Sequence, residues 1–272
     1  MIGCSWGKAS LGGRRLAYGR KWPDLFITGF AIVSRRQVLV GLGLGVALGA
    51  GTYAGAADET HMGHVVLLGD SIFDNSAYVG GGPDVVRQLR ERLPNGWRAS
   101  LMAVDGSVVA DLAKQLARIP KDATHIVISA GGNDALGYSS ILAAPSKSMA
   151  ESLMQLAEIH DEFQVRYAAA INGILQSRLP TAVCTIYDPR YPDPVQRRLG
   201  ATALTIINDV IVREAVRLGL PLLELRMIFD EDSDFANSIE PSSHGGWKMV
   251  GAIASLLAKH DFASSRSEVF TR

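Results

Sequence analysis

The sequence predicts an α/β protein whose parallel sheet is covered by helices on both faces. Apolar runs of strand length alternate along the chain with segments whose apolar residues recur at helical spacing. The strand-length runs are apolar at consecutive positions, which is typical of parallel strands buried on both faces. Since right-handed crossovers connect such strands, we expect a flavodoxin-like, doubly wound sheet of five strands in a three-layer α/β/α arrangement.

The expected strands are apolar runs of four to six residues. Several of them end at glycine or at a short polar segment, as strands that enter turns do. The five runs are residues 64–68, 99–104, 125–130, 182–187 and 220–223.

The segments between these runs carry apolar residues three or four positions apart, which predicts amphipathic helices. Pro94 and Pro120 lie where the first two patterns end, and Gly219 follows the fourth, as helix stop signals do. We find no internal repeat, so residues 57–272 are expected to form a single domain. The expected helices cover residues 85–93, 109–119, 149–174, 204–215 and 250–257.

The N-terminal segment has the parts of an export signal. Arg35 and Arg36 precede an uncharged, Gly-rich apolar run at 38–50, and small residues follow at 54–57. Paired arginines before a weakly hydrophobic run are typical of the twin-arginine type. We expect residues 1–56 to be such a signal, with a long start, and the protein to be periplasmic or secreted. The alternative is an uncleaved anchor, which is the only contact with a membrane that the sequence suggests.

Charge and residue spacing exclude two classes of partner. Residues 1–56 hold seven of the 27 Lys and Arg residues but only one of the 27 acidic residues, so residues 57–272 carry a formal charge of −6. An acidic domain does not favour nucleic-acid binding, which needs a basic face. The His and Cys residues match no spacing typical of metal ligands, and we expect no metal and no other cofactor.

Ser71 is the candidate nucleophile. It follows the apolar run at 64–68 in the turn Gly69-Asp70-Ser71. Open α/β sheets bind their ligands at the carboxyl ends of the strands, where this turn is expected to lie. A serine at that edge can attack an ester if a base and oxyanion donors lie nearby.

Other polar segments follow later strands, at residues 103–107 and 130–134, and one precedes the last helix at 239–246. His244 is the candidate base, because the unperturbed pKa of histidine lies near neutral pH. For the oxyanion hole we expect the backbone N–H groups of Ser71 and Gly106 and the side-chain amide of Asn133, which is a neutral donor.

At these residues the chain resembles the SGNH/GDSL hydrolase family. The turn containing Ser71 matches the first block of the family, Gly106 the second, Gly131-Gly132-Asn133-Asp134 the third and His244 the last. The four blocks occur in the family order within residues 64–260. The resemblance implies a flavodoxin-like sheet, serine-dependent ester hydrolysis and no metal.

One position departs from the family pattern. The family usually has an aspartate three residues before the histidine, where this chain has Pro241. Glu240 is the nearest carboxylate and is a candidate to orient His244, and Asp234 is a more distant one. Alternatively, a backbone carbonyl orients His244, in which case Ser71 and His244 form a working catalytic dyad.

These residues predict an exported serine esterase that acts on a small-molecule or glycan ester. Ser71 attacks the carbonyl, and His244 moves the proton. Two alternatives stay open: a glycan O-acetyl esterase or acyltransferase using the same residues, and a non-catalytic binding module on the same fold. The segments 138–147 and 188–197 are expected to form the pocket walls, with Tyr187, Arg190 and Tyr191 available to meet a polar group.

Overall fold

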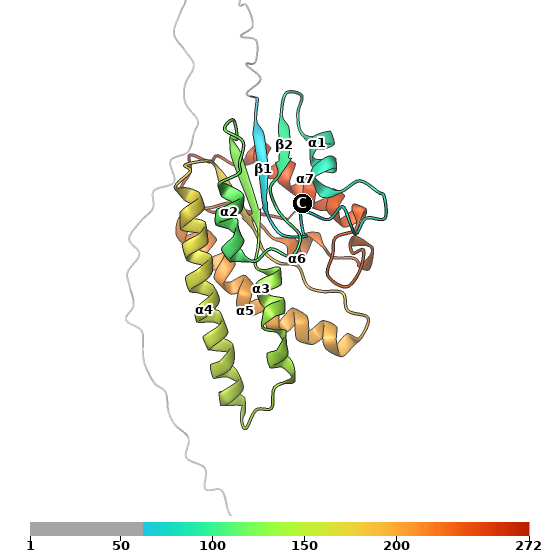
Figure 1. Ribbon diagram of the computed structural model, residues 1–272, viewed down its shortest axis with the longest axis vertical. Coiled ribbons are helices and arrows are strands. Elements are labelled where there is room, and N and C mark those ends of the chain that lie inside the picture. Colours follow the sequence, from blue (N-terminus) through green and yellow to red (C-terminus); the bar gives the residue numbers. More distant parts are fainter. Residues whose placement is uncertain (1–61, 272) are drawn as a thin grey trace, which may run out of the picture. The chain divides into compact units, whose positions relative to one another are not determined.

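The computed structural model describes residues 62–271. The expected export signal at residues 1–56 lies outside them, so the structure does not bear on it. Figure 1 shows a sheet between two layers of helices, which is the expected three-layer arrangement. No helix within residues 62–271 is both long enough and apolar enough to cross a membrane.

All the strands of the sheet are parallel, and they lie in the order β2-β1-β3-β4-β5-β6. The first five have the order of a flavodoxin-like sheet, as predicted. The strands are β1 (His64–Gly69), β2 (Arg98–Leu101), β3 (His125–Ser129), β4 (Thr181–Cys184), β5 (Leu222–Leu223) and β6 (Val269–Phe270).

The expectation of five strands is wrong by one. The sixth strand, β6, pairs Val269 with Leu222 and Phe270 with Leu223 at the edge of the sheet. It has two residues and is partly exposed, so it does not form the apolar run by which a buried strand is recognised.

The five expected helices are present, but α5 and α7 begin earlier than expected, α7 at Ser243 instead of residue 250, and the short helices α3 and α6 were not predicted. Asp193 accepts a hydrogen bond of 3.0 Å from Val195 N, and Pro194 occupies the first turn, so α5 begins well before the expected residue 204. Aspartate at the N-cap followed by proline is a strong start signal. The helices are α1 (Val85–Arg92), α2 (Leu112–Leu116), α3 (Gly132–Gly137), α4 (Met149–Leu175), α5 (Pro194–Leu218), α6 (Leu225–Ile228) and α7 (Ser243–Lys259), with 3₁₀ turns at Val109–Asp111, Ser139–Ala143 and Asp232–Asp234.

The residues of β1 alternate between two apolar cores, one on each face of the sheet. Val65 and Leu67 pack into the core that also holds residues of α1 and α7. Val66 and Leu68 pack into the core formed with α2, α4 and α5. Because consecutive side chains of a strand point to opposite faces, one apolar run serves both layers.

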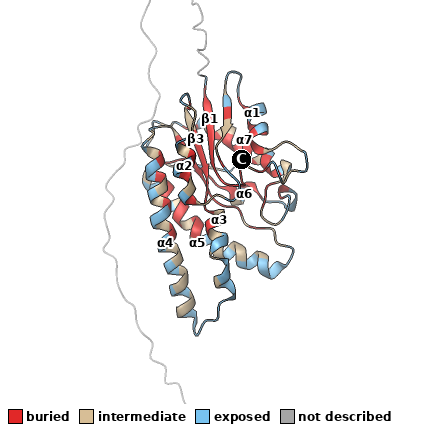
Figure 2. Cartoon of the chain, in the orientation of Figure 1, coloured by how far each residue is buried: buried red, intermediate tan, exposed pale blue. Residues whose placement is uncertain are grey.

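The first turns of α4 and the start of α5 extend beyond the carboxyl ends of the strands (Figure 1). Figure 2 shows that these ends are largely exposed, in contrast to the buried strands. Met149 and Leu153 on α4 are among their exposed apolar residues. This extension lies on the side of the sheet where Ser71 follows β1.

Candidate active site

The turn after β1 requires glycine and places Ser71 at the end of the strand. Gly69 has a φ of 137°, and a Cβ there would lie 1.8 Å from the carbonyl oxygen of Ser129 on β3. Asp70 Oδ1 then accepts a hydrogen bond of 3.1 Å from Ile72 N, which closes the turn. Ser71 therefore lies at the carboxyl end of the sheet, as predicted from the sequence.

The hydroxyl of Ser71 contacts Glu240. Ser71 Oγ donates a hydrogen bond of 3.1 Å to Glu240 Oε1, and both residues are buried, with 8% and 7% of their surface exposed. Glu240 lies in the loop before α7. The sequence suggested Glu240 as a residue that orients His244, whereas the structure brings it to Ser71.

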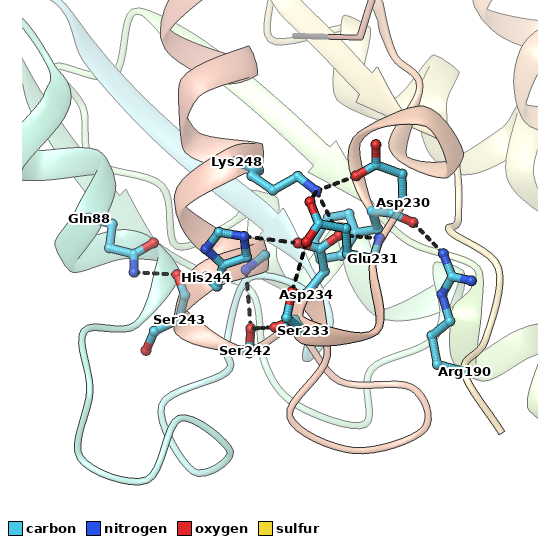
Figure 3. A network of polar contacts seen from close by, with 12 residues as sticks. Gln88, Arg190, Asp230, Glu231, Ser233, Asp234, Ser242, Ser243, His244 and Lys248 are labelled. Atoms are coloured by element: carbon cyan, nitrogen blue, oxygen red, sulfur yellow. Dashed lines mark hydrogen bonds and ion pairs between the residues drawn. The ribbon is translucent and has the colours of Figure 1, made fainter. Parts of the chain in front are cut away.

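His244 lies elsewhere. It is in the first turn of α7, its side chain is 55% exposed, and its Nε2 lies 3.7 Å from Asp234 Oδ1 (Figure 3). Asp234 is fully buried and also binds Lys248, whose Nζ lies 2.7 Å from Oδ2. Within residues 62–271, no hydrogen bond or ion pair joins His244 to Ser71 or to Glu240. The structure thus brings His244 to Asp234, the more distant of the two candidate carboxylates.

Other contacts hold the start of α7 in place. Ser242 Oγ accepts from Gly245 N at 3.2 Å and donates to Ser233 O at 2.7 Å (Figure 3). Gln88 Nε2 on α1 donates a hydrogen bond of 2.8 Å to Ser243 O. The side chain of His244 is therefore placed by a well-anchored helix start.

The expected oxyanion donors lie in neighbouring turns. Asn133 Nδ2 donates a hydrogen bond of 2.9 Å to Ser107 O, which ties the start of α3 to the turn after β2 that contains Gly106. Gly106 has a φ of 78° and open space around it. Among the described residues, neither Ser71 N nor Gly106 N makes a hydrogen bond. Asn133 and Ser71 line the same pocket.

Two further carboxylates, those of Asp70 in the turn and Asp134 on α3, are buried near Ser71. Asp134 Oδ2 accepts from Val109 N at 2.9 Å, whereas Asp70 Oδ2 is buried without a hydrogen-bond partner. Burial, and to a smaller extent the nearby charges of Glu240 and Asp134, raise the pKa of Asp70 to about 7.

The pKa of Glu240 is also high. Burial raises it to about 7, and the negative charge of Asp105 acts in the same direction. The hydrogen bond from Ser71 opposes this shift, because it stabilises the ionised carboxylate. Glu240 therefore exchanges its proton near neutral pH.

Ser71, Asn133 and Glu240 open onto one pocket with a volume of about 570 Å³. Both segments expected to form its walls contribute to it, 138–147 and 188–197. Sequence reasoning missed the apolar residues of α4 and α5 that line it, because their spacing also suits an ordinary core. These residues are Leu156, Ile159, Leu199, Leu204, Ile206 and Ile207.

Two of the polar residues expected to face a substrate are used within the protein. Tyr187 Oη donates a hydrogen bond of 2.6 Å to Ile239 O, and Arg190 Nη2 donates one of 3.2 Å to Phe229 O. Tyr187 and Tyr191 both line the pocket, and Arg190 does not. In residues 62–271, no group of three or more His, Cys, Asp and Glu side chains is arranged to hold a metal ion.

Comparison with solved structures shows a shared fold. An extracellular lipase from Streptomyces rimosus has 18% identity and a TM-score of 0.51, over 73% of this chain and 100% of that chain. The esterase EstA from a Pseudoalteromonas species has 15% identity and a TM-score of 0.51, over 72% and 99%. A carbohydrate acetylesterase from Sinorhizobium meliloti has 14% identity and a TM-score of 0.50, over 72% and 98%.

Sequence comparison identifies the family. No curated protein matches the chain. The model of the GDSL-like lipase/acylhydrolase family matches residues 67–245, which include Ser71, Gly106, Asn133 and His244. The chain therefore belongs to the GDSL-like lipase/acylhydrolase family and is an enzyme that hydrolyses ester bonds.

Proposed function

We propose that this enzyme hydrolyses carboxylic esters that carry an apolar acyl chain, with Ser71 as the nucleophile. The observation that carries the proposal is the position of Ser71, which lines a pocket of about 570 Å³ with largely apolar walls. Pockets of this size hold small organic ligands, and an apolar wall favours the burial of hydrocarbon.

In the proposed reaction Ser71 Oγ attacks the ester carbonyl carbon and gives its proton to a general base. The N–H groups of Ser71 and Gly106 and the amide of Asn133 stabilise the negative charge on the carbonyl oxygen. The alcohol leaves with the proton, and water then releases the acid from Ser71. The sequence predicts His244 as the base, whereas the hydrogen bond of Ser71 favours Glu240.

The pocket supports an acyl chain longer than acetyl. Its apolar lining from α4 and α5 is more extensive than an acetyl group needs, and the side chains of Tyr187 and Arg190 are occupied by the protein's own carbonyl groups. A glycan O-acetyl esterase would need polar groups facing the sugar. The known acetylesterase with the same fold shares 14% identity, which supports the fold and not the substrate.

The proposal includes export of the enzyme to the periplasm or the medium. It rests on the paired arginines and apolar run of residues 34–50. The mass of the chain recovered outside the cytoplasm tests this: removal of about the first 56 residues supports export with cleavage, and an intact chain in the membrane fraction supports an anchor.

The activity is tested with p-nitrophenyl esters from acetyl to palmitoyl. We expect the highest kcat/KM for acyl chains longer than acetyl, and no measurable hydrolysis by Ser71→Ala. Ser76→Ala is the matched control, because Ser76 is exposed in the same connection and does not line the pocket. Full activity of Ser71→Ala would overturn the proposal, and a preference for acetylated glycans would replace its substrate class.

A further inference from the structure

We propose that Glu240, and not a histidine, is the general base that activates Ser71. This inference depends on the proposed role of Ser71 as the nucleophile. The hydrogen bond of 3.1 Å from Ser71 Oγ to Glu240 Oε1 is within the range from which a base takes a proton directly.

The carboxylate of Glu240 has no second protein donor to satisfy it. Its Oε2 is buried without a hydrogen-bond partner among the described residues, so Ser71 is the donor that the structure provides. A buried carboxylate with one donor is poorly stabilised in its ionised form and is correspondingly basic. This environment suits a proton acceptor better than a structural ion pair.

The backbone holds Glu240 in place. Glu240 N donates a hydrogen bond of 3.0 Å to Asn237 Oδ1, and Glu240 O accepts one of 2.8 Å from Ala236 N. A short antiparallel bridge between Phe235 and Pro241 closes the same loop. The carboxylate is therefore presented by a defined turn.

The residues on either side of Glu240 are anchored to other elements. Ile239 O accepts from Tyr187 Oη at 2.6 Å, and Pro241 O accepts from Asn75 Nδ2 at 3.2 Å. These contacts connect the loop to the segments that follow β4 and β1. Such support keeps a base within reach of its proton, which efficient proton transfer requires.

Burial, and to a smaller extent the nearby negative charge of Asp105, keeps the pKa of Glu240 high. The titratable groups that interact with Glu240 are Asp70, Asp105, Tyr78 and Tyr187. Within the described part of the chain, none of the groups that shift its pKa is a cation. The resulting pKa of about 7 is near the value of a free imidazole, which is the range in which a general base is most effective at neutral pH.

The proton is conserved through both steps. As Ser71 Oγ forms its bond to the ester carbonyl carbon, its proton passes to Glu240, which becomes a neutral carboxylic acid. When the bond to the alcohol breaks, Glu240 returns the proton to the leaving oxygen. In the second step Glu240 takes a proton from water as the water attacks the acyl-enzyme, and gives it to Ser71 Oγ as that bond breaks.

The position of His244 agrees with this assignment. Its imidazole is 55% exposed and lies near the buried carboxylate of Asp234, and it does not line the pocket that contains Ser71. In the first turn of α7, His244 therefore belongs to the polar network around Asp234 that Figure 3 shows, and not to the pocket.

The test measures hydrolysis of a p-nitrophenyl ester by the full chain and by variants at Glu240, His244, Ser71 and Glu91. We expect Glu240→Gln to lower kcat/KM by about 10²–10⁴-fold, the usual contribution of a general base. Glu240→Ala should regain activity when formate is added, because a small carboxylate can occupy the space of the lost one. His244→Gln should stay within a few-fold of the unchanged enzyme. Glu91→Gln, an exposed glutamate on α1, is the control for loss of a carboxylate.

The outcomes separate this inference from the proposed function. Near-normal activity of Glu240→Gln overturns the inference, and so does a folded Glu240→Ala that formate does not restore, with folding checked by the Tm. Loss of activity in His244→Ala that imidazole restores would instead make His244 the base. In each of these cases an inactive Ser71→Ala leaves the proposed function standing, and only an active Ser71→Ala removes it.

Discussion

The hydroxyl of Ser71 donates a hydrogen bond of 3.1 Å to the carboxylate of Glu240, which lies 169 residues later in the chain. This contact joins the carboxyl end of β1 to the loop before α7. In a serine hydrolase, the group that contacts the nucleophile decides how its proton is removed. The pH dependence and the substrate preference of the enzyme should therefore depend on this pair and on the pocket that it faces.

Replacing Asn133, the proposed side-chain donor of the oxyanion hole, should slow the reaction. We expect Asn133→Ala to lower kcat by about 10²–10³-fold, because one donor to the developing charge is lost. KM should change less, since the charge develops in the transition state. Asn172→Ala on the exposed face of α4 is the matched control. Equal loss of kcat in both variants would argue against an oxyanion role for Asn133.

Filling the pocket should change the preferred chain length. Ala203 on α5 lines the pocket, so Ala203→Phe is expected to lower kcat/KM for long acyl esters at least tenfold while acetyl esters are hydrolysed nearly as before. The loss is of the order expected when about two methylene groups can no longer be buried. Thr202→Phe introduces the same ring at an exposed neighbour and is the control. An unchanged chain-length profile in Ala203→Phe would place the acyl chain elsewhere.

Asp70 should make the enzyme less stable at high pH. Its pKa is raised from 3.8 to about 7 in the folded protein, so the folded state holds this proton more tightly than the unfolded state does. The contribution of this proton to the free energy of unfolding is fully present below pH 3.8 and is lost as the pH rises through about 7. A difference of about three pH units, at about 1.4 kcal/mol each, limits the effect to about 4 kcal/mol.

Asp70→Asn should therefore raise the free energy of unfolding at pH 8, because it keeps an oxygen for Ile72 N and buries no charge. The measurement is urea unfolding at pH 5 and pH 8, with Asp161→Asn on the exposed face of α4 as the control. An Asp70→Asn variant that is no more stable than the unchanged enzyme at pH 8 contradicts the prediction.

The pH dependence of activity should follow the ionisation of the Glu240 carboxyl. The base acts in its ionised form, so kcat/KM should fall as the pH drops below about 7, the pKa of this carboxyl. Asp105→Asn removes a negative charge that raises this pKa, and it should move the midpoint to lower pH by a few tenths of a unit. His244→Gln should leave the midpoint where it is. A midpoint that shifts with His244→Gln and not with Asp105→Asn would assign it to the histidine.

Much of the fold could be predicted because runs of consecutive apolar residues mark the buried strands, and apolar residues at helical spacing mark the helices. The positions of β1 and β3 and the sheet order agree with the expectation. The edge strand β6 could not be predicted, since two residues are too few to show a pattern. The early start of α5 had a signal in Asp193-Pro194, which a helix assignment based on apolar spacing alone overlooks.

The site was harder to predict than the fold. The positions of Ser71 and Asn133 follow from their place at strand ends, which topology fixes. Which side chain of the loop before α7 reaches Ser71 depends instead on the turn at Asn237 and on the anchoring of the loop by Tyr187. Neither contact has a sequence period, so Glu240 and His244 could not be told apart by spacing.

Activation of Ser71 by Glu240 is tested most directly by the rate at which an organophosphonate ester modifies Ser71, measured by mass spectrometry of the peptide. We expect one adduct, on Ser71, forming at similar rates in the unchanged enzyme and in His244→Gln, and at least about 100-fold more slowly in Glu240→Gln. An adduct on another residue, or equally fast labelling of Ser71 in Glu240→Gln, would contradict this expectation.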